Sequence, residues 1–112
     1  MLSFFISSAA KAIDPPYQKE MARLTQILGS LYFLQPLCNF TDVNWRNEAS
    51  VLINLDRPDN DRKQRLKGAF NQGFQDYANT YNSCTPSANL AREQLLIEAK
   101  EKSLDIHTRF AE

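Results

Sequence analysis

The sequence predicts an all-α fold: an antiparallel four-helix bundle with one short helix and one intrachain disulfide. Apolar residues recur at spacings of three and four in four segments, no segment alternates with a period of two, and the joins between segments are short. The chain has 112 residues, of which 43% are hydrophobic and 23% charged, which is typical of one soluble globular domain.

The first predicted helix runs from Pro16 to Leu37 and has one apolar face. Asp14, before two prolines, is expected to start it, and Pro36 is expected to end it. Gly29 lies inside this helix, where glycine costs about 1 kcal/mol relative to alanine, so we expect a close helix–helix contact there. The apolar face consists of Leu24, Ile27, Leu28, Leu31 and Leu34.

The second predicted helix runs from Val43 to Leu55, and Thr41 or Asp42 is expected to cap its start. It is the shortest of the four, so one face of the bundle should be incompletely covered. We expect the resulting groove to be the place where a partner binds. The apolar face consists of Trp45, Ala49, Leu52 and Leu55.

The third predicted helix runs from Asp61 to Tyr81. Asp59 or Asp61 places negative charge at its start, which favours the helix dipole. Gly68 and Gly73 predict further close approaches between helices. The apolar stripe consists of Leu66, Phe70, Phe74, Tyr77 and Tyr81.

The fourth predicted helix runs from Pro86 to Phe110. Thr85 is expected to cap it, with Pro86 at the first helical position, where the missing backbone N–H of proline costs nothing. The apolar face consists of Ala88, Ala91, Leu95, Ala99, Ile106 and Phe110.

The two cysteines, Cys38 and Cys84, each follow the end of a predicted helix. If successive helices run antiparallel, both fall at the same end of the bundle, which favours a bridge with Cα atoms about 4.4–6.8 Å apart. Closing a loop of this length would stabilise the fold by roughly 4 kcal/mol. The alternative is two reduced thiols in a cytosolic protein.

Residues 1–12 differ from the rest and are predicted to be the remnant of an export signal, with residues 13–112 forming a single helical domain. A short apolar run around Phe4 and Phe5 precedes Ala10-Lys11-Ala12, which has the small-x-small form of a signal-peptidase site. The run is too short to span a bilayer, which takes about 20 apolar residues. The prediction is a periplasmic or secreted protein; the alternative is a frayed, mildly apolar N-terminus.

The sequence contains no convincing catalytic or metal-binding pattern, so none is predicted, and no cofactor is implied. Its 13 basic and 13 acidic residues balance, which argues against nucleic acid as a partner. His107 is the only histidine, and it lies about 30 Å along the helix from Cys84, too far for a nucleophile–base pair. The carboxylates of Asp56, Asp59 and Asp61 do not have the spacing of a calcium loop.

Four residues are the candidate binding residues: Trp45 and Arg46 on the second helix, with Asn71 and Tyr77 on the third. Tryptophan and arginine are enriched in binding hot spots, although Trp45 fits a core position as well. The predicted function is non-catalytic binding of a protein or a small apolar ligand in the groove. The alternatives are a small envelope enzyme or accessory subunit with a site near the second helix, and a cytosolic regulatory bundle. The sequence names neither the ligand nor the oligomeric state.

Several short motifs resemble those of a family of small uncharacterised secreted proteins of alphaproteobacteria. The resemblance covers roughly residues 20–90 and rests mainly on Phe70-Asn71-x-Gly73-Phe74 followed by Tyr81-x-x-Cys84-Thr85. Leu28-Gly29-x-Leu31 and Asn44-Trp45-Arg46 fit as well. The resemblance implies an exported helical protein and supplies no catalytic residues.

Overall fold

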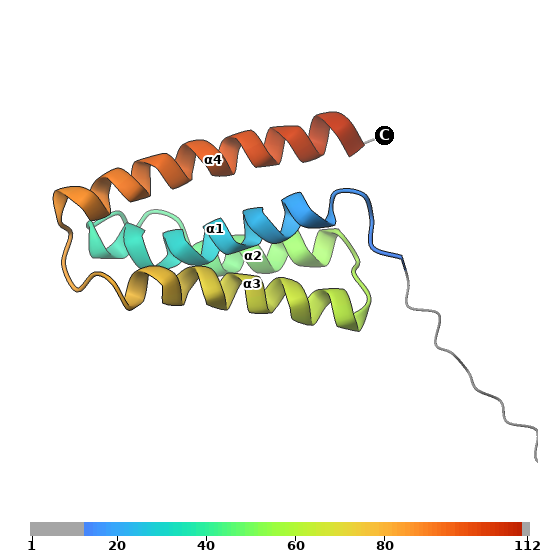
Figure 1. The fold of residues 1–112 in the computed structure, drawn as a ribbon, viewed down its shortest axis with the longest axis horizontal. Coiled ribbons are helices and arrows are strands. Elements are labelled where there is room, and N and C mark those ends of the chain that lie inside the picture. Colours follow the sequence, from blue (N-terminus) through green and yellow to red (C-terminus); the bar gives the residue numbers. More distant parts are fainter. Residues whose placement is uncertain (1–12, 111–112) are drawn as a thin grey trace, which may run out of the picture.

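The computed structural model describes residues 13–110, which form four helices (Figure 1). The predicted all-α bundle with a short second helix is confirmed, and no strand occurs within this range. Residues 1–12, where the predicted export remnant falls, lie outside the described residues. The helices are α1 (Gln18–Leu37), α2 (Trp45–Leu55), α3 (Asn60–Ala78) and α4 (Pro86–Phe110).

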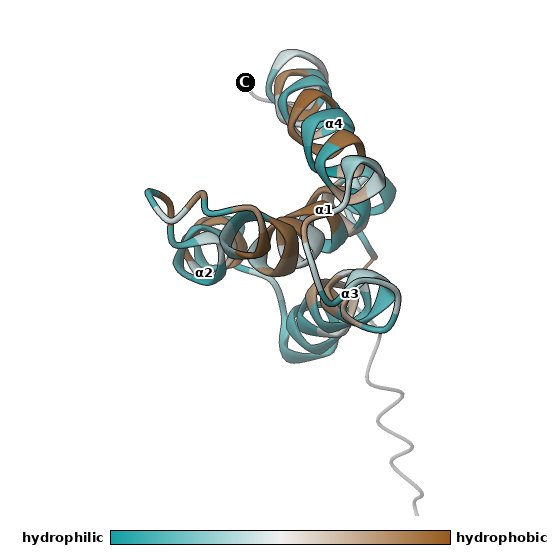
Figure 2. Cartoon of the chain, turned by 90° about the vertical axis from the view of Figure 1, so that its left-hand side faces the viewer, coloured by the Kyte–Doolittle hydropathy of each residue, from teal (hydrophilic) through white to brown (hydrophobic). Residues whose placement is uncertain are grey.

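Helix α1 is the centre of the fold. It packs against each of the other three helices, whereas α4 packs against α1 alone and α2 touches α3 only slightly. Figure 2 shows α2, α3 and α4 arranged around α1 in three directions. Burial follows this arrangement, because α1 contributes the fully buried Ile27, Leu31 and Leu34 to the main apolar core. Ala88 and Leu95 of α4 complete this core.

Two glycines allow α1 and α3 to come into backbone contact. A Cβ atom on Gly29 would lie 1.9 Å from the carbonyl oxygen of Phe70, and one on Gly73 would lie 1.8 Å from that of Gln26. The Ser30 hydroxyl donates a hydrogen bond of 2.9 Å to the Gly73 carbonyl in the same seam. The close approaches predicted at these two glycines are therefore confirmed.

The close approach predicted at Gly68 is wrong. A Cβ atom there would meet nothing within 4 Å, because Gly68 lies on the exposed side of α3. Gly73 lies seven residues after the buried Leu66 and therefore on the same side of the helix, whereas Gly68 lies two residues after Leu66 and points about 200° away.

The predicted start of α1 is wrong by two residues. The helix begins at Gln18 after Tyr17, which makes no side-chain capping bond. Asp14 does not cap the helix; its carboxylate pairs with Arg65 of α3. A contact between distant segments thus takes precedence over the local capping signal.

The predicted cap of α2 is also wrong. The helix begins at Trp45, and the side chain of Asn44 accepts a hydrogen bond of 3.0 Å from the backbone N–H of Asn47. Thr41 and Asp42 lie in the turn before it. All three residue types make good caps, so the sequence does not distinguish among neighbouring candidates.

The predicted cap of α4 is confirmed, and Asp59, one of the two acids predicted at the start of α3, caps that helix. Asp59 accepts a hydrogen bond of 2.7 Å from the backbone N–H of Arg62, and Thr85 accepts one of 3.0 Å from that of Ala88. Helix α3 ends at Ala78, short of Tyr81, whose hydroxyl is 2.7 Å from that of Ser87 on α4.

A turn at Asn39 ends α1 after Leu37, so Pro36 lies within the last helical turn rather than ending it. Asn39 has a left-handed backbone with φ of 67°. The N–H of Phe40 bonds to the Gln35 carbonyl at 2.8 Å, and that of Asn39 bonds to the Pro36 carbonyl at 3.0 Å. This is the Schellman pattern, in which two otherwise unpaired carbonyls find donors.

The predicted disulfide is confirmed. Cys38, at the end of α1, and Cys84, before α4, are bonded with Cα atoms 5.1 Å apart. The buried Arg92 of α4 reinforces the same corner, since its guanidinium lies 3.9 Å from the ring centroid of Phe40 and donates to Gln35 at 3.1 Å. The bridge therefore joins α4 to the one helix against which it packs.

Candidate functional site

A groove of about 550 Å³ lies beside α2 and is lined by residues of α1, α2 and α3; α2 and α3 touch each other only slightly. Its base comes from α1 and α3 and one wall from the buried Ala49 and Ile53 of α2. A groove beside the shortest helix is what the helix lengths led us to expect. The lining residues are Tyr32, Arg46, Ala49, Ser50, Ile53, Asn54, Lys63, Lys67, Phe70, Asn71 and Phe74.

The floor of the groove is aromatic. The ring of Tyr32 on α1 lies 5.7 Å from the rings of both Phe70 and Phe74 on α3, measured between centroids. The ring of Phe33 meets that of Phe74 edge-on, with 5.5 Å between the centroids. The rings of Tyr32, Phe70 and Phe74 are half-buried, and all three line the groove. The contact between Gly29 and Phe70 holds this floor in place, because it fixes the distance between α1 and α3.

Three cations line the groove and no carboxylate does. Arg46 comes from α2, while Lys63 and Lys67 come from successive turns of α3. Among residues 13–108, no ion pair joins any of the three to an acid. Two lysines at i and i+4 repel each other and cost a helix about 0.2–0.5 kcal/mol. The fold thus keeps unneutralised positive charge over an apolar floor.

The four predicted binding residues fall in two places. Arg46 and Asn71 are exposed and line the groove. Trp45 and Tyr77 pack against the main core instead, and the ring of Tyr77 stacks on that of Tyr81 at 6.4 Å. The indole N–H of Trp45 is buried and finds no acceptor in the described part of the chain.

Sequence reasoning missed the two lysines. A signal was present, because Lys63, Lys67, Phe70, Asn71 and Phe74 follow one helical face at spacings of four, three, one and three. Of this face, only Asn71 was predicted to bind, and Phe70 and Phe74 were assigned to the apolar stripe. Recognising it as the side of a groove requires knowing that α2 touches α3 only slightly and leaves this face open.

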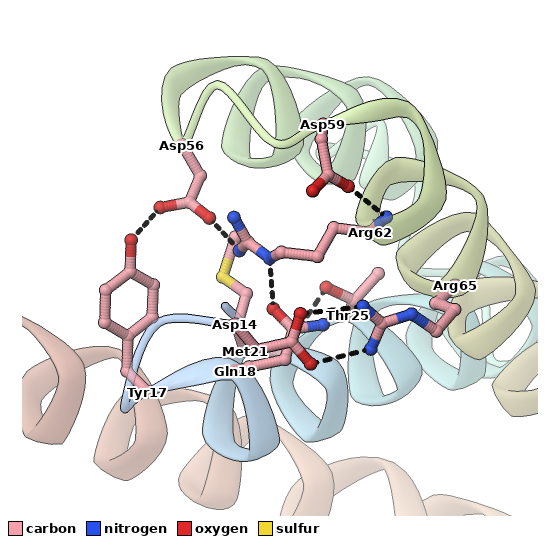
Figure 3. A network of polar contacts seen from close by, with 9 residues as sticks. All are labelled: Asp14, Tyr17, Gln18, Met21, Thr25, Asp56, Asp59, Arg62 and Arg65. Carbon is pink, nitrogen blue, oxygen red and sulfur yellow. Dashed lines mark hydrogen bonds and ion pairs between the residues drawn. The ribbon is translucent and has the colours of Figure 1, made fainter. Parts of the chain in front are cut away.

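A second cluster of charges, at the start of α1, is fully paired (Figure 3). The Asp56 carboxylate lies between the hydroxyl of Tyr17 and the buried guanidinium of Arg62, and it accepts a hydrogen bond from each. Arg62 also donates to Gln18 at 2.6 Å. The hydrogen bond to Asp56, together with burial, raises the pKa of Tyr17 above its ordinary value of 10.0. We call these four residues the charged corner.

Arg65, on the exposed side of the same corner, is paired with two acids. Its guanidinium donates to both oxygens of Asp14, at 2.7 and 3.0 Å, and to Asp61 at 3.1 Å. The hydrogen bond from Arg65 lowers the pKa of Asp14 below its ordinary value of 3.8, and the same bond raises the pKa of Arg65. These contacts attach the segment before α1 to α3.

A smaller hollow of about 340 Å³ lies between the start of α1, the end of α2 and α4. No lysine or arginine lines it, and its one carboxylate, Asp56, is already bound by Tyr17 and Arg62. Its remaining lining is Met21, Leu24, Leu52, Leu55, Ser103, Ile106 and His107. The hollow is mainly apolar, so it offers fewer charged side chains to bind an ionic group than the larger groove does.

Residues 13–110 contain neither a metal-binding cluster nor a membrane-spanning helix. No three side chains among histidine, cysteine, aspartate and glutamate come together there in a way that could hold a metal ion. None of the helices in this range combines the length and apolarity needed to cross a lipid bilayer.

The fold and the groove define a small all-α protein with a central helix and a disulfide at one corner. The chain belongs to the family described as protein of unknown function (DUF2385), whose model matches residues 16–110. This agrees with the resemblance to an uncharacterised family. No curated protein and no solved structure matches the chain.

Proposed function

We propose that the protein binds a small organic anion in the groove between α1, α2 and α3, without catalysing a reaction. The ligand has an aromatic or aliphatic body, which rests on Tyr32, Phe70 and Phe74, and an acidic group, which meets the cations. Asn71 and Ser50 offer polar contacts at the rim.

One observation carries this proposal: Arg46, Lys63 and Lys67 converge on the groove without an acid to neutralise them. Hydrogen bonds that involve a charged group contribute more than neutral ones, about 1.5–3 kcal/mol each. An uncharged apolar ligand would leave the three cations unused and would displace water from them. The three cations therefore favour an apolar molecule that carries an acidic group over one that carries no charge.

The proposed location is outside the cytosol, in the cell envelope or beyond it. The Cys38–Cys84 bridge supports this, since stable disulfides form in oxidising compartments. The signal-like features of residues 1–12 and the resemblance to secreted proteins point the same way. Intact mass of the native protein tests it: the exported form should lack residues 1–12 and two cysteine protons, and a full-length reduced chain would contradict it.

Fluorescence titration with 1-anilinonaphthalene-8-sulfonate, an aromatic sulfonate, tests the proposed ligand class. Lys63→Ala and Lys67→Ala should each weaken binding at least about tenfold, because the lost charged contact contributes about 1.5 kcal/mol or more. Lys19→Ala, at an exposed lysine outside the groove, is the matched control and should bind as the parent does. Equal binding by all three variants would contradict the proposal.

The uncharged N-phenyl-1-naphthylamine separates the role of the floor from that of the cations. It should bind the parent and both groove variants with the same affinity, because it touches only the apolar surface. Added salt should weaken binding of the sulfonate and leave binding of the amine unchanged. Salt screens the attraction between exposed charges, with a screening length of about 10 Å at 0.1 M ionic strength. Loss of amine binding in the lysine variants would show that they damage the groove itself.

A further inference from the structure

Helix α4 has apolar residues on two opposite sides. Its inner side faces α1 through Ala88, Leu95 and Ala99. Leu90, Ile97 and Leu104 remain 54%, 60% and 54% exposed. Successive residues turn by 100°, so Ile97 points about 200° away from Leu95. We call Leu90, Ile97 and Leu104 the outer stripe.

The outer stripe fills one of the two apolar positions of a coiled-coil heptad, and Glu93 and Lys100 stand at the other. Its members are seven residues apart, and seven-residue spacing keeps side chains on one side of a helix that faces a partner helix. The stripe spans about 21 Å of helix. Because α4 packs against α1 alone within the described residues, neither α2 nor α3 covers this side. Figure 1 shows α4 along the edge of the molecule.

The stripe is symmetric about Ile97, which has one leucine seven residues before it and one seven residues after it. We propose that it binds the same stripe of a second copy of this chain, with the two α4 helices antiparallel and Ile97 packed on Ile97. A two-fold interface requires a self-complementary surface, and this arrangement places Leu90 of each copy on Leu104 of the other.

The charges beside the stripe fit this pairing. Glu93 and Lys100 lie on one flank, and both are exposed. In the antiparallel pair Glu93 of each copy lies opposite Lys100 of the other, which gives two ion pairs. On the other flank Gln94 lies opposite Glu101, so no like charges meet. Antiparallel helix dipoles also attract one another.

The proposed interface is small. Three apolar side chains per copy fall at the low end of specific interfaces, those below about 1,200 Å², so association should depend on protein concentration. Sedimentation velocity over a range of concentrations should show a monomer–dimer equilibrium. A protein that stays monomeric up to about 1 mM, where only the weakest complexes fail to form, would overturn the proposal.

Two variants test whether the outer stripe mediates the association. Ile97→Glu should weaken it by roughly tenfold or more, because it places two charges at the centre of an apolar contact. Val51→Glu is the matched control, since Val51 is an exposed apolar residue on α2, 46% accessible, and should leave the equilibrium unchanged. Circular dichroism checks that both variants fold. Equal association by Ile97→Glu and the parent would overturn the proposal.

A charge swap tests the orientation. Glu93→Lys and Lys100→Glu should each weaken the dimer, and the double variant should restore it. Glu93 also lies 3.8 Å from Arg92 of its own chain, a contact that the double variant does not rebuild. Restoration therefore reports the contact between copies. In a parallel pair, Lys100 would lie opposite Glu101 of the other copy. If Lys100→Glu combined with Glu101→Lys restores the dimer instead, the helices are parallel and the antiparallel pairing is wrong.

Discussion

Helix α3 presents two kinds of basic residue within two turns. Arg62 and Arg65 face the start of α1, and each is bound by at least one carboxylate. Lys63 and Lys67 face the groove, where no carboxylate lines the wall. Arg62 is 6% exposed and Lys67 lies on the exposed rim. The two sides of the helix thus differ in partners, burial and type of cation.

The difference separates charges that hold the fold from charges that are free to bind. A guanidinium offers several donors in a rigid plane, so Arg62 can satisfy Asp56 and Gln18 together inside the protein. An ammonium group on a flexible chain stays hydrated until a ligand approaches, as suits Lys63 and Lys67. Substitutions should therefore affect stability at the charged corner and ligand binding at the groove.

The largest effect is expected at the charged corner. Asp56→Asn should lower the free energy of unfolding by about 3–5 kcal/mol, because it leaves the buried Arg62 without its counter-charge. Denaturant titration measures this. Combining Asp56→Leu with Arg62→Met should cost clearly less, since it removes both charges. A loss below 1 kcal/mol for Asp56→Asn would mean that the corner is not a structural ion pair.

The seam that carries the groove floor should give the next largest effect. Gly29→Ala should destabilise the protein by about 1–3 kcal/mol or more, because the new methyl group meets the Phe70 carbonyl. Gly68→Ala is the matched control, and it should stabilise the protein by up to about 1 kcal/mol since that position is open. Thermal unfolding should show a lower melting temperature for Gly29→Ala and a higher one for Gly68→Ala. An unchanged melting temperature for Gly29→Ala would contradict the backbone contact between α1 and α3.

A smaller effect is expected at the partly exposed pair that links α1 to α4. Arg23 donates to both oxygens of Glu98, at 2.6 and 2.7 Å, and this bond lowers the pKa of Glu98 below its ordinary value of 4.5. Because the pKa of Glu98 is lower in the folded than in the unfolded protein, the ionised carboxylate stabilises the fold at any pH above the unfolded pKa. This stabilisation is lost as the pH falls through the folded pKa. Glu98→Gln should therefore cost up to about 1 kcal/mol at pH 7.

The pH dependence of the same variant makes the test sharper. The difference in stability between parent and Glu98→Gln should shrink below pH 4.5, where the glutamate takes up a proton. Urea titrations at pH 7 and at pH 3 measure it. A difference that stays constant over this range would show that the charge on Glu98 contributes nothing to stability.

The smallest effect on stability is expected in the groove. Lys63→Ala and Lys67→Ala should change the free energy of unfolding by no more than about 0.5 kcal/mol, because neither side chain has a carboxylate partner. Removing one of two like charges at i and i+4 should even be slightly stabilising. A loss above 1.5 kcal/mol in denaturant titration would place these lysines among the structural charges and erase the contrast with Arg62.

The sequence predicted the features that depend on periodicity, and it predicted the close helix contacts at Gly29 and Gly73. It missed the features that depend on the paths of the helices or on a choice among neighbouring residues. The four helices and the Cys38–Cys84 bridge follow from apolar spacing and matched positions at helix ends. The cap at Thr85 was also predicted, as was an acid, Asp59 or Asp61, at the start of α3. Asn44 was missed because neighbouring residues cap equally well, so local preference does not choose among them.

The groove was only partly predictable. A short second helix implied an open face, and Arg46 and Asn71 do line the groove there. Tryptophan is a residue type common in binding sites, but Trp45 packs on the core, because the start of α2 lies against the main core cluster. The contribution of Lys63 and Lys67 depends on the path of α2, which no local pattern encodes.

The most direct test of the central claim is a two-dimensional ¹⁵N–¹H NMR titration of the full chain with 1-anilinonaphthalene-8-sulfonate. The account predicts that the amide signals that move belong to groove residues, among them Ser50, Lys67 and Asn71. Signals of the charged corner at Gln18 and Arg62 should stay in place. Shifts confined to the smaller hollow, or no saturable shift at the groove, would contradict the account.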